Sequence, residues 1–296
     1  MLAIAVVSSI VALLFLGYTL AMMFRDIPVE PVPVSMPSDA TGDTLVIAVG
    51  RTPGGQSEWA NYVTLMKYLQ DTVGRPIRMR YVADREEADE VFKSGEADAG
   101  FVCTRSYLLL REAGIVHELV APITSGASTE TAMVLVQADS EARTLEDLRG
   151  RSVAVSSRTS VSGASYLYWL ADSQGFKVDE FFGGIVVSPT QEESLKKLER
   201  GEVDSAVGCS TEVKGYPAGT FRAVSVSPQY ALPPFVVSND LDEATVAKLR
   251  NALLGFDAEA MLPKGSGLNG FTQVSEEAYA FSFTLLEYIP NDIEKQ

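Results

Sequence analysis

The amino-acid sequence predicts an α/β protein built from two similar lobes, and three observations lead to this prediction. A nine-residue frame occurs twice, as GEADAGFVC at 95–103 and as GEVDSAVGC at 201–209, and the two copies hold both cysteines of the chain. Each copy ends a run in which strands alternate with helices, the order typical of a mostly parallel sheet covered on both faces. Two extended segments, 132–140 and 222–238, lie where the chain is expected to cross between the lobes.

The first lobe is predicted to begin with a buried strand at 44–50, which ends in glycine. Apolar residues then recur at helical spacing over 57–74, where Gly74 is a suitable residue to end a helix. The elements that follow continue the alternation: a strand at 77–83, an acidic helix at 84–94 and a strand at 97–103.

The second lobe is predicted to repeat this order. Its elements alternate in the same way: a strand at 151–156, a helix at 160–175, a strand at 185–189, a helix at 191–200 and a strand at 204–209. Each copy of the frame therefore ends on the third strand of its lobe. Because ligands of open α/β sheets bind beyond the carboxyl ends of the strands, we expect Cys103 and Cys209 to face the binding cleft. Helices after residue 241 are expected to pack on the first lobe.

The N-terminal segment predicts export from the cytoplasm. Its first 24 residues carry no charged side chain and are long enough to span a bilayer, either as an uncleaved anchor or as a cleaved signal peptide. Four prolines between 27 and 43 then predict an extended linker. The predicted organisation has four parts: an anchor or signal at 1–26, a linker at 27–43, lobe 1 at 44–137 plus 223–296, and lobe 2 at 138–222.

Composition and charge exclude several function classes. The formal net charge of −15 argues against nucleic-acid binding, which needs a basic surface to displace counterions. The chain has one histidine, without a Ser/His/Asp or Cys/His arrangement at recognisable spacing, and neither a Walker loop nor a GxGxxG follows a predicted strand, so we predict no enzyme. Two cysteines and one histidine are too few for a structural zinc site, and we predict no metal and no cofactor.

Several stretches together carry a resemblance to a known family: the turn Gly50-Arg51-Thr52-Pro53, KSGEADAGFV at 93–102, TLEDLRGRSVAVS at 144–156, and Ser160-Val161-Ser162-Gly163. Over roughly 44–290 the chain resembles the periplasmic solute-binding proteins of phosphate, phosphite and phosphonate ABC transporters. The resemblance implies a type II periplasmic-binding-protein fold, in which two α/β lobes are joined by two crossing strands. It also implies a small oxyanion as ligand, an ABC permease as partner and an extracytoplasmic location.

The family holds its oxyanion at a Ser-Thr-Ser-Gly turn at a helix N-terminus. The matching positions here are Ser160, Ser162 and Gly163, and valine replaces the middle hydroxyl. Free N–H groups and hydroxyls at such a helix end can donate to phosphoryl-type oxygens. An ordinary N-cap is the alternative interpretation of this turn.

Further ligand contacts are expected on both lobes, and the resemblance implies the one at Tyr107. They are Arg51, Thr52, Cys103, Thr104 and Tyr107 on the first lobe, and Cys209 and Ser210 on the second. Relatives that bind aminoalkyl phosphonates hold the amine with carboxylates on the second lobe. Because this chain carries cysteine and serine at the corresponding strand end, an aminophosphonate is not the expected ligand.

The two cysteines leave three interpretations open: small buried residues, a disulfide in an oxidising compartment, or thiol ligands for a soft solute. The stretch FVCT at 101–104 resembles arsenite-sensing relatives of the family, in which a cleft cysteine takes part in binding. The sequence therefore predicts a binding protein that delivers a phosphate, phosphite, phosphonate or arsenic oxyanion to an ABC transporter. The alternative is an arsenite- or arsenate-sensing protein whose partner is the periplasmic domain of a sensor kinase.

Overall fold

The computed structural model describes residues 44–50, 56–157 and 160–288, all within one compact unit, Thr41–Gln296. The predicted membrane segment at 1–26 and the linker at 27–43 lie outside the described residues and stay predictions. Within the described part of the chain, no helix is both long enough and apolar enough to cross a bilayer.

The first lobe contains a six-stranded sheet with the order β13-β4-β12-β3-β1-β2. Its strands are β1 (Leu45–Gly50), β2 (Ile77–Val82), β3 (Ala99–Phe101), β4 (Val116–Thr124), β12 (Phe235–Ser238) and β13 (Leu268–Thr272). β1 pairs in parallel with β2 and β3, whereas β12 and β13 pair antiparallel to their neighbours. The three strands predicted for the start of this lobe are confirmed.

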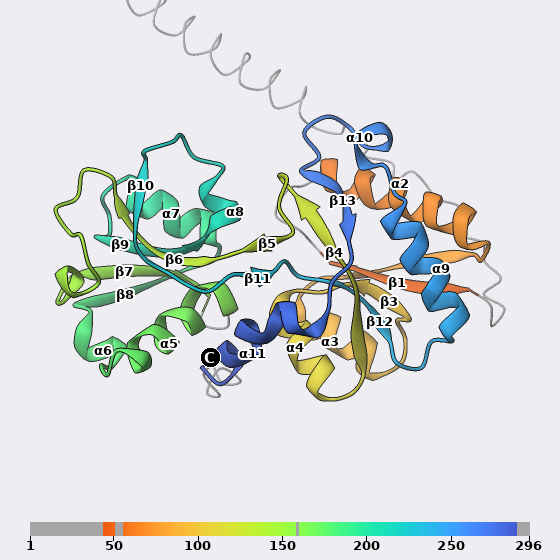
Figure 1. Ribbon diagram of the computed structural model, residues 1–296, viewed down its shortest axis with the longest axis horizontal. Helices are drawn as coiled ribbons and strands as arrows, with labels where there is room; N and C mark the ends of the chain where they lie inside the picture. Colours follow the sequence, from red (N-terminus) through yellow and green to blue (C-terminus); the bar gives the residue numbers. More distant parts are fainter. Residues whose placement is uncertain (1–43, 51–55, 158–159, 289–296) are drawn as a thin grey trace, which may run out of the picture. The chain divides into compact units, whose positions relative to one another are not determined.

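The central strand β1 is buried on both faces. Leu45, Ile47 and Val49 are fully buried in the cluster that contains α2 (Gln56–Val73) and α9 (Glu243–Leu254). Ala48 points the other way, into the cluster that contains α3 (Arg85–Lys93) and α4 (Thr104–Glu112). Figure 1 shows these two helix pairs on opposite sides of the sheet. Burial on both faces explains why β1 is a continuous apolar run rather than an alternating one.

The second lobe contains a five-stranded sheet with the order β10-β6-β9-β7-β8. Its strands are β6 (Ala132–Gln137), β7 (Ser152–Ser156), β8 (Gly184–Ser188), β9 (Ser205–Cys209) and β10 (Phe221–Val226). One face is covered by α7 (Gln191–Glu199), and the other by α5 (Tyr166–Ser173) and α6 (Val178–Phe181), as Figure 1 shows. β7 lies between β8 and β9 and pairs in parallel with both, as β1 does with β2 and β3.

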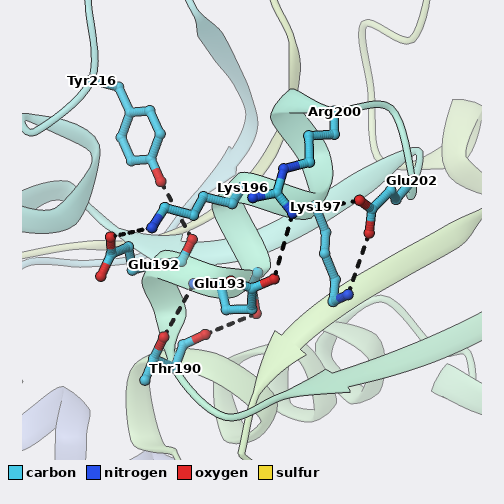
Figure 2. A network of polar contacts seen from close by, with 9 residues as sticks. Thr190, Glu192, Glu193, Lys196, Lys197, Arg200, Glu202 and Tyr216 are labelled. Carbon is cyan, nitrogen blue, oxygen red and sulfur yellow. Dashed lines mark hydrogen bonds and ion pairs between the residues drawn. The ribbon is translucent and has the colours of Figure 1, made fainter. Parts of the chain in front are cut away.

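Helix α7 has a buried face and a solvated one. Its leucines at 195 and 198 are fully buried against the sheet, while its outer face carries ion pairs within the helix and with the turn that follows it (Figure 2). Lys196 pairs with Glu192 at 2.6 Å, and Lys197 pairs with Glu202 at 3.3 Å. Exposed pairs of this kind contribute about 0–1 kcal/mol each, so the buried leucines, rather than the charges, hold the helix on the sheet.

A short ribbon of two antiparallel strands connects the lobes. It consists of β5 (Thr129–Glu130) and β11 (Tyr230–Ala231), with Glu130 directly opposite Tyr230. The predicted crossings at 132–140 and 222–238 were too long, because 132–137 and 221–226 pair with each other as β6 and β10 of the second sheet. The second sheet therefore extends beyond both predicted boundaries of lobe 2, at 138 and 222.

The repeated frame has the same structure in both lobes. Gly95 and Gly201 follow the preceding helices with φ of 73° and 70°, a left-handed conformation that suits glycine. Asp98 accepts a hydrogen bond from a backbone N–H at the start of β1 at 2.7 Å, and Asp204 accepts the equivalent bond from the start of β7 at 2.9 Å. Each frame thus ends its helix and ties its own strand to the central strand of the lobe.

The C-terminal elements contact both lobes rather than the first lobe alone. They are α10 (Ala258–Met261), a 3-10 turn (Glu276–Tyr279) and α11 (Ala280–Leu286). The ring of Tyr279 packs on Tyr107 of α4 with centroids 4.6 Å apart, and the ring of Phe281 meets Trp169 of α5 edge to face at 5.0 Å. Helix α11 therefore connects the two lobes at a second place, apart from the ribbon.

Candidate functional site

The predicted anion turn opens with a π-helical turn rather than a regular α-helix. Residues Val161–Ser165 form this turn and lead directly into α5. The Ser165 N–H donates to the Ser160 carbonyl at 3.1 Å, the five-residue spacing of a π-helix. The prediction of one regular helix over 160–175 was wrong in this first turn, because the wider bond spacing is decided by packing on β7 and β9.

Gly163 allows the turn to lie directly on the end of β7. A Cβ atom at this position would meet the Ser156 hydroxyl at 2.8 Å and the Ser156 carbonyl at 3.0 Å. Real side chains do not approach so closely, so a larger residue at 163 would push the turn away from the strand. The glycine of the predicted motif therefore has a packing role here.

Several buried hydroxyls near this turn make no hydrogen bond within the part of the chain that the structure describes. They belong to Ser156 at the end of β7, Ser188 at the end of β8, Ser165 in the turn itself and Tyr230 on β11, all of which are at most 4% exposed. Ser156 and Ser188 are cross-strand neighbours. A buried polar group without a partner costs about 1–3 kcal/mol, so these hydroxyls are free to bind a ligand or ordered water.

Gln191 joins two of the predicted site residues. Its side-chain Nε2 donates to Ser162 Oγ at 2.6 Å, and its Oε1 accepts from the backbone N–H of Cys209 at 3.1 Å. Ser162 and Cys209 are thus brought to one place by the first residue of α7. Sequence reasoning missed Gln191, although its position just after the carboxyl end of a strand was a usable signal.

Cys209 is buried in a polar cluster. Its side chain is 5% exposed, and its Sγ lies 3.0 Å from Thr211 Oγ1. Burial raises the pKa of this thiol strongly, and the nearby carboxyl of Glu130 raises it further. The group is therefore a protonated thiol at neutral pH. Ser210 Oγ accepts from the Thr131 N–H, just after β5, at 3.1 Å, and its predicted ligand contact stays a prediction.

Glu130 and Tyr230, which sequence reasoning missed, complete this cluster. Glu130 is 7% exposed, and its Oε2 accepts from Thr211 Oγ1 at 2.7 Å. Burial raises the pKa of the Glu130 carboxyl, while the hydrogen bond from Thr211 opposes that rise. Both residues lie in the connecting ribbon, which the sequence did not mark as part of a site.

The first-lobe residues show a second, more open environment. Cys103 is half-buried and forms the N-cap of α4, where its Sγ accepts from the Ser106 N–H at 3.5 Å. Thr104 is the first residue of α4 and is buried. Arg51 and Thr52, which were predicted to face the anion, lie outside the described residues.

Tyr107 belongs to the core of the first lobe. Its side chain is fully buried, and its hydroxyl donates to Glu118 Oε2 at 2.9 Å. Burial and the negative charge of Glu118 raise the pKa of this hydroxyl. In this structure its hydrogen bond is therefore made within the lobe, while the predicted ligand contact stays a prediction.

Both cysteines are free in the structure, so no disulfide joins the lobes. The described residues also contain no group of three or more His, Cys, Asp or Glu side chains that could hold a metal ion. Hydroxyls, amides and a buried carboxyl are the groups gathered at the ends of β7, β8 and β9.

Comparison with protein-family models matches residues 55–279 to the family described as "ABC transporter, phosphonate, periplasmic substrate-binding protein". This match covers well over half of the chain. The chain belongs to this family. Members are substrate-binding transport proteins and not enzymes, and the family implies an extracytoplasmic location, so these predictions are confirmed. A search of curated proteins by sequence found no match.

Several solved structures have a similar fold. A Xanthomonas citri protein bound to a chloride ion has a TM-score of 0.68 at 18% identity, covering 83% of this chain and 97% of that one. PhnD1 of Prochlorococcus marinus, in complex with methylphosphonate, has a TM-score of 0.64 at 13% identity, with the same coverage. A binding-protein component of a Pseudomonas aeruginosa ABC phosphonate transporter reaches 0.61 at 15% identity, covering 79% and 82%. The predicted type II periplasmic-binding-protein fold is confirmed.

Proposed function

We propose that this family member captures a small tetrahedral oxyanion between the carboxyl ends of its two sheets and delivers it to an ABC permease. The observation that carries the proposal is the set of unpartnered buried hydroxyls around the turn at 160–163. Ser156 and Ser188 supply two of them, and Gly163 keeps the backbone of the turn against the first. Hydroxyl and N–H donors of this kind stabilise phosphoryl-type oxygens without a charged side chain.

The ligand range follows from the chemistry of this turn. Hard oxygen atoms are the expected partners of hydroxyl and amide donors, so phosphate, phosphite, methylphosphonate and arsenate are the leading candidates. Burial and the raised pKa of the Cys209 thiol disfavour the thiolate, so a soft ligand is less expected at Cys209 than at the half-buried Cys103. The overall charge of −15 does not oppose such binding, since the donors act at short range.

The turn is tested by replacing Ser160 and Ser162 together with alanine. We expect affinity for the best oxyanion to fall at least about tenfold, because a hydrogen bond to a charged group contributes about 1.5–3 kcal/mol. The affinities are measured by calorimetric titration with phosphate, phosphite, methylphosphonate, arsenate and sulfate. The matched control replaces Ser94 and Ser173, whose hydroxyls bond only local carbonyls. Equal affinities in the two double variants would disprove the assignment.

One observation favours a second candidate, sensing of an arsenic oxyanion. Cys103 is a free, half-buried thiol at the end of β3, and thiol groups bind soft centres such as As(III). On this proposal arsenite raises the melting temperature of the wild type and not that of Cys103→Ser, while phosphate stabilises both equally. Arsenite stabilisation that survives in Cys103→Ser would remove this candidate.

A further inference from the structure

A buried carboxyl in the connecting ribbon reaches the strand end of the second lobe. Glu130 on β5 is 7% exposed and lies opposite Tyr230 on β11. The Thr211 hydroxyl donates to Glu130 Oε2 at 2.7 Å and is itself 3.0 Å from the sulfur of Cys209. Glu130 is therefore bonded to the residues that follow β9, although it belongs to neither large sheet.

Two side chains connect Glu130 with the anion turn. Gln191 bonds Ser162 and the Cys209 backbone at once, so the turn and the strand end form one cluster. Tyr230 is 1% exposed, and its hydroxyl has no hydrogen-bond partner within the described residues. Ser162 and Glu130 are nevertheless close enough to this hydroxyl to shift its pKa. A ligand at the turn would thus lie beside this tyrosine and the carboxyl.

The charge of Glu130 is not balanced by a cation within the described residues. None of the ion pairs found there includes it, and its polar neighbours are Thr211, Cys209 and Tyr230, with the carboxyl of Glu212 also close enough to interact. A buried carboxylate without a cation is costly, and a hydrogen-bond donor on the ligand lowers that cost. A ligand hydroxyl is such a donor.

We propose that Glu130 makes the site selective for oxyanions that carry a hydroxyl, with the bound anion and Glu130 sharing that proton. This inference rests on the proposed function, because it requires the anion to lie at 160–163. The monoanion of methylphosphonate donates its hydroxyl to the carboxylate. Methanesulfonate has the same shape and charge but no proton to donate, so two negative groups would meet.

The test compares these two anions by calorimetric titration near neutral pH. In the wild type we expect methylphosphonate to bind at least about thirtyfold more tightly than methanesulfonate. In Glu130→Gln the amide can donate to either anion, so this ratio is expected to fall at least about tenfold, the loss of one hydrogen bond to a charged group. Glu212→Gln, which makes the same change in net charge nearby, is the matched control and keeps the wild-type ratio.

Each outcome decides a different point. If the wild type binds methylphosphonate and methanesulfonate with affinities within about threefold of each other, the inference is overturned. This result needs no variant, so it holds even if Glu130→Gln fails to fold. An unchanged ratio in folded Glu130→Gln, or an equal fall in Glu212→Gln, also overturns it while leaving oxyanion capture intact. Wild-type protein that binds none of the phosphorus or arsenic oxyanions refutes the proposed function itself, and the selectivity with it.

Discussion

The two copies of the repeated frame share a backbone but differ in what surrounds their cysteines. Cys103 is half-buried and caps the nine-residue helix α4, whereas Cys209 is buried and precedes the four-residue helix α8 (Ser210–Val213) beside Glu130. The glycine and aspartate positions keep equivalent bonds in both lobes. The comparison teaches that the frame specifies the fold, while the residues outside it specify the chemistry at each strand end.

The copies also differ in how closely their strands pack. Gly100 in the first frame corresponds to Ala206 in the second. A Cβ at Gly100 would meet the backbone oxygen of Ala48 at 2.4 Å, whereas Ala206 already carries a Cβ and is fully buried. The first lobe therefore has a closer approach between its central strand and β3, and a matched pair of substitutions can measure it.

The largest expected difference between the copies is in thiol reactivity. In Cys209→Ser protein, the remaining Cys103 should react with a thiol reagent at least about a hundredfold faster than Cys209 does in Cys103→Ser protein. The reason is that burial and the neighbouring carboxyl raise the pKa of the Cys209 thiol and so remove thiolate, the reacting species. The ratio of the two reaction rates is measured from initial rates at about pH 8. Both variants should react at the same rate in denaturant, and comparable native rates would show that the environments are alike.

A smaller effect is expected from exchanging the glycine and alanine of the two frames. Gly100→Ala should lower the free energy of unfolding by about 2–3 kcal/mol, because the new methyl group overlaps a backbone oxygen that cannot rotate away. Ala206→Gly should cost only about 1 kcal/mol, through lost burial and backbone entropy. Urea unfolding of the wild type and both variants measures these two losses in the free energy of unfolding. Equal costs would mean that the two strand pairs are equally tight.

The smallest predicted effect concerns the two aspartates of the frame. Asp98→Asn and Asp204→Asn should each lower the free energy of unfolding by about 1 kcal/mol, since an amide oxygen accepts the same backbone bond more weakly than a carboxylate. Asp204 should show the larger loss, because the Ser152 hydroxyl also donates to it at 2.6 Å. The same urea measurement applies, with Asp139→Asn on the surface as control. A larger loss at Asp98 would contradict this order.

Most elements of the fold could be predicted from the sequence, because their signals are local. Short, continuous apolar runs marked β1 and β7, and glycines marked the ends of α2 and α3. The connecting ribbon could not be located, since 132–137 and 221–226 look extended whether they cross between lobes or pair with each other. Only the pairing partner, which lies about ninety residues away, decides that question.

The site was predictable only where a motif marked it. The turn with Ser162 and the strand end at Cys209 were expected from their motifs, and Gln191 joins them. Glu130 was missed because its role depends on contacts with residues about eighty positions away. The sequence did not indicate that Glu118 on a neighbouring strand bonds the Tyr107 hydroxyl, and the ligand contact of Tyr107 stays a prediction.

The contact between Phe281 and Trp169 gives this receptor a natural optical probe. Trp169 belongs to the second lobe, while Tyr279, two residues before Phe281, is packed on the first. A hinge movement that separates the lobes must therefore alter the indole surroundings or shift the C-terminal helix. The chain's other tryptophan, Trp59, is on α2 and contacts Tyr81 of the same lobe, so it provides an internal reference for emission from Trp169.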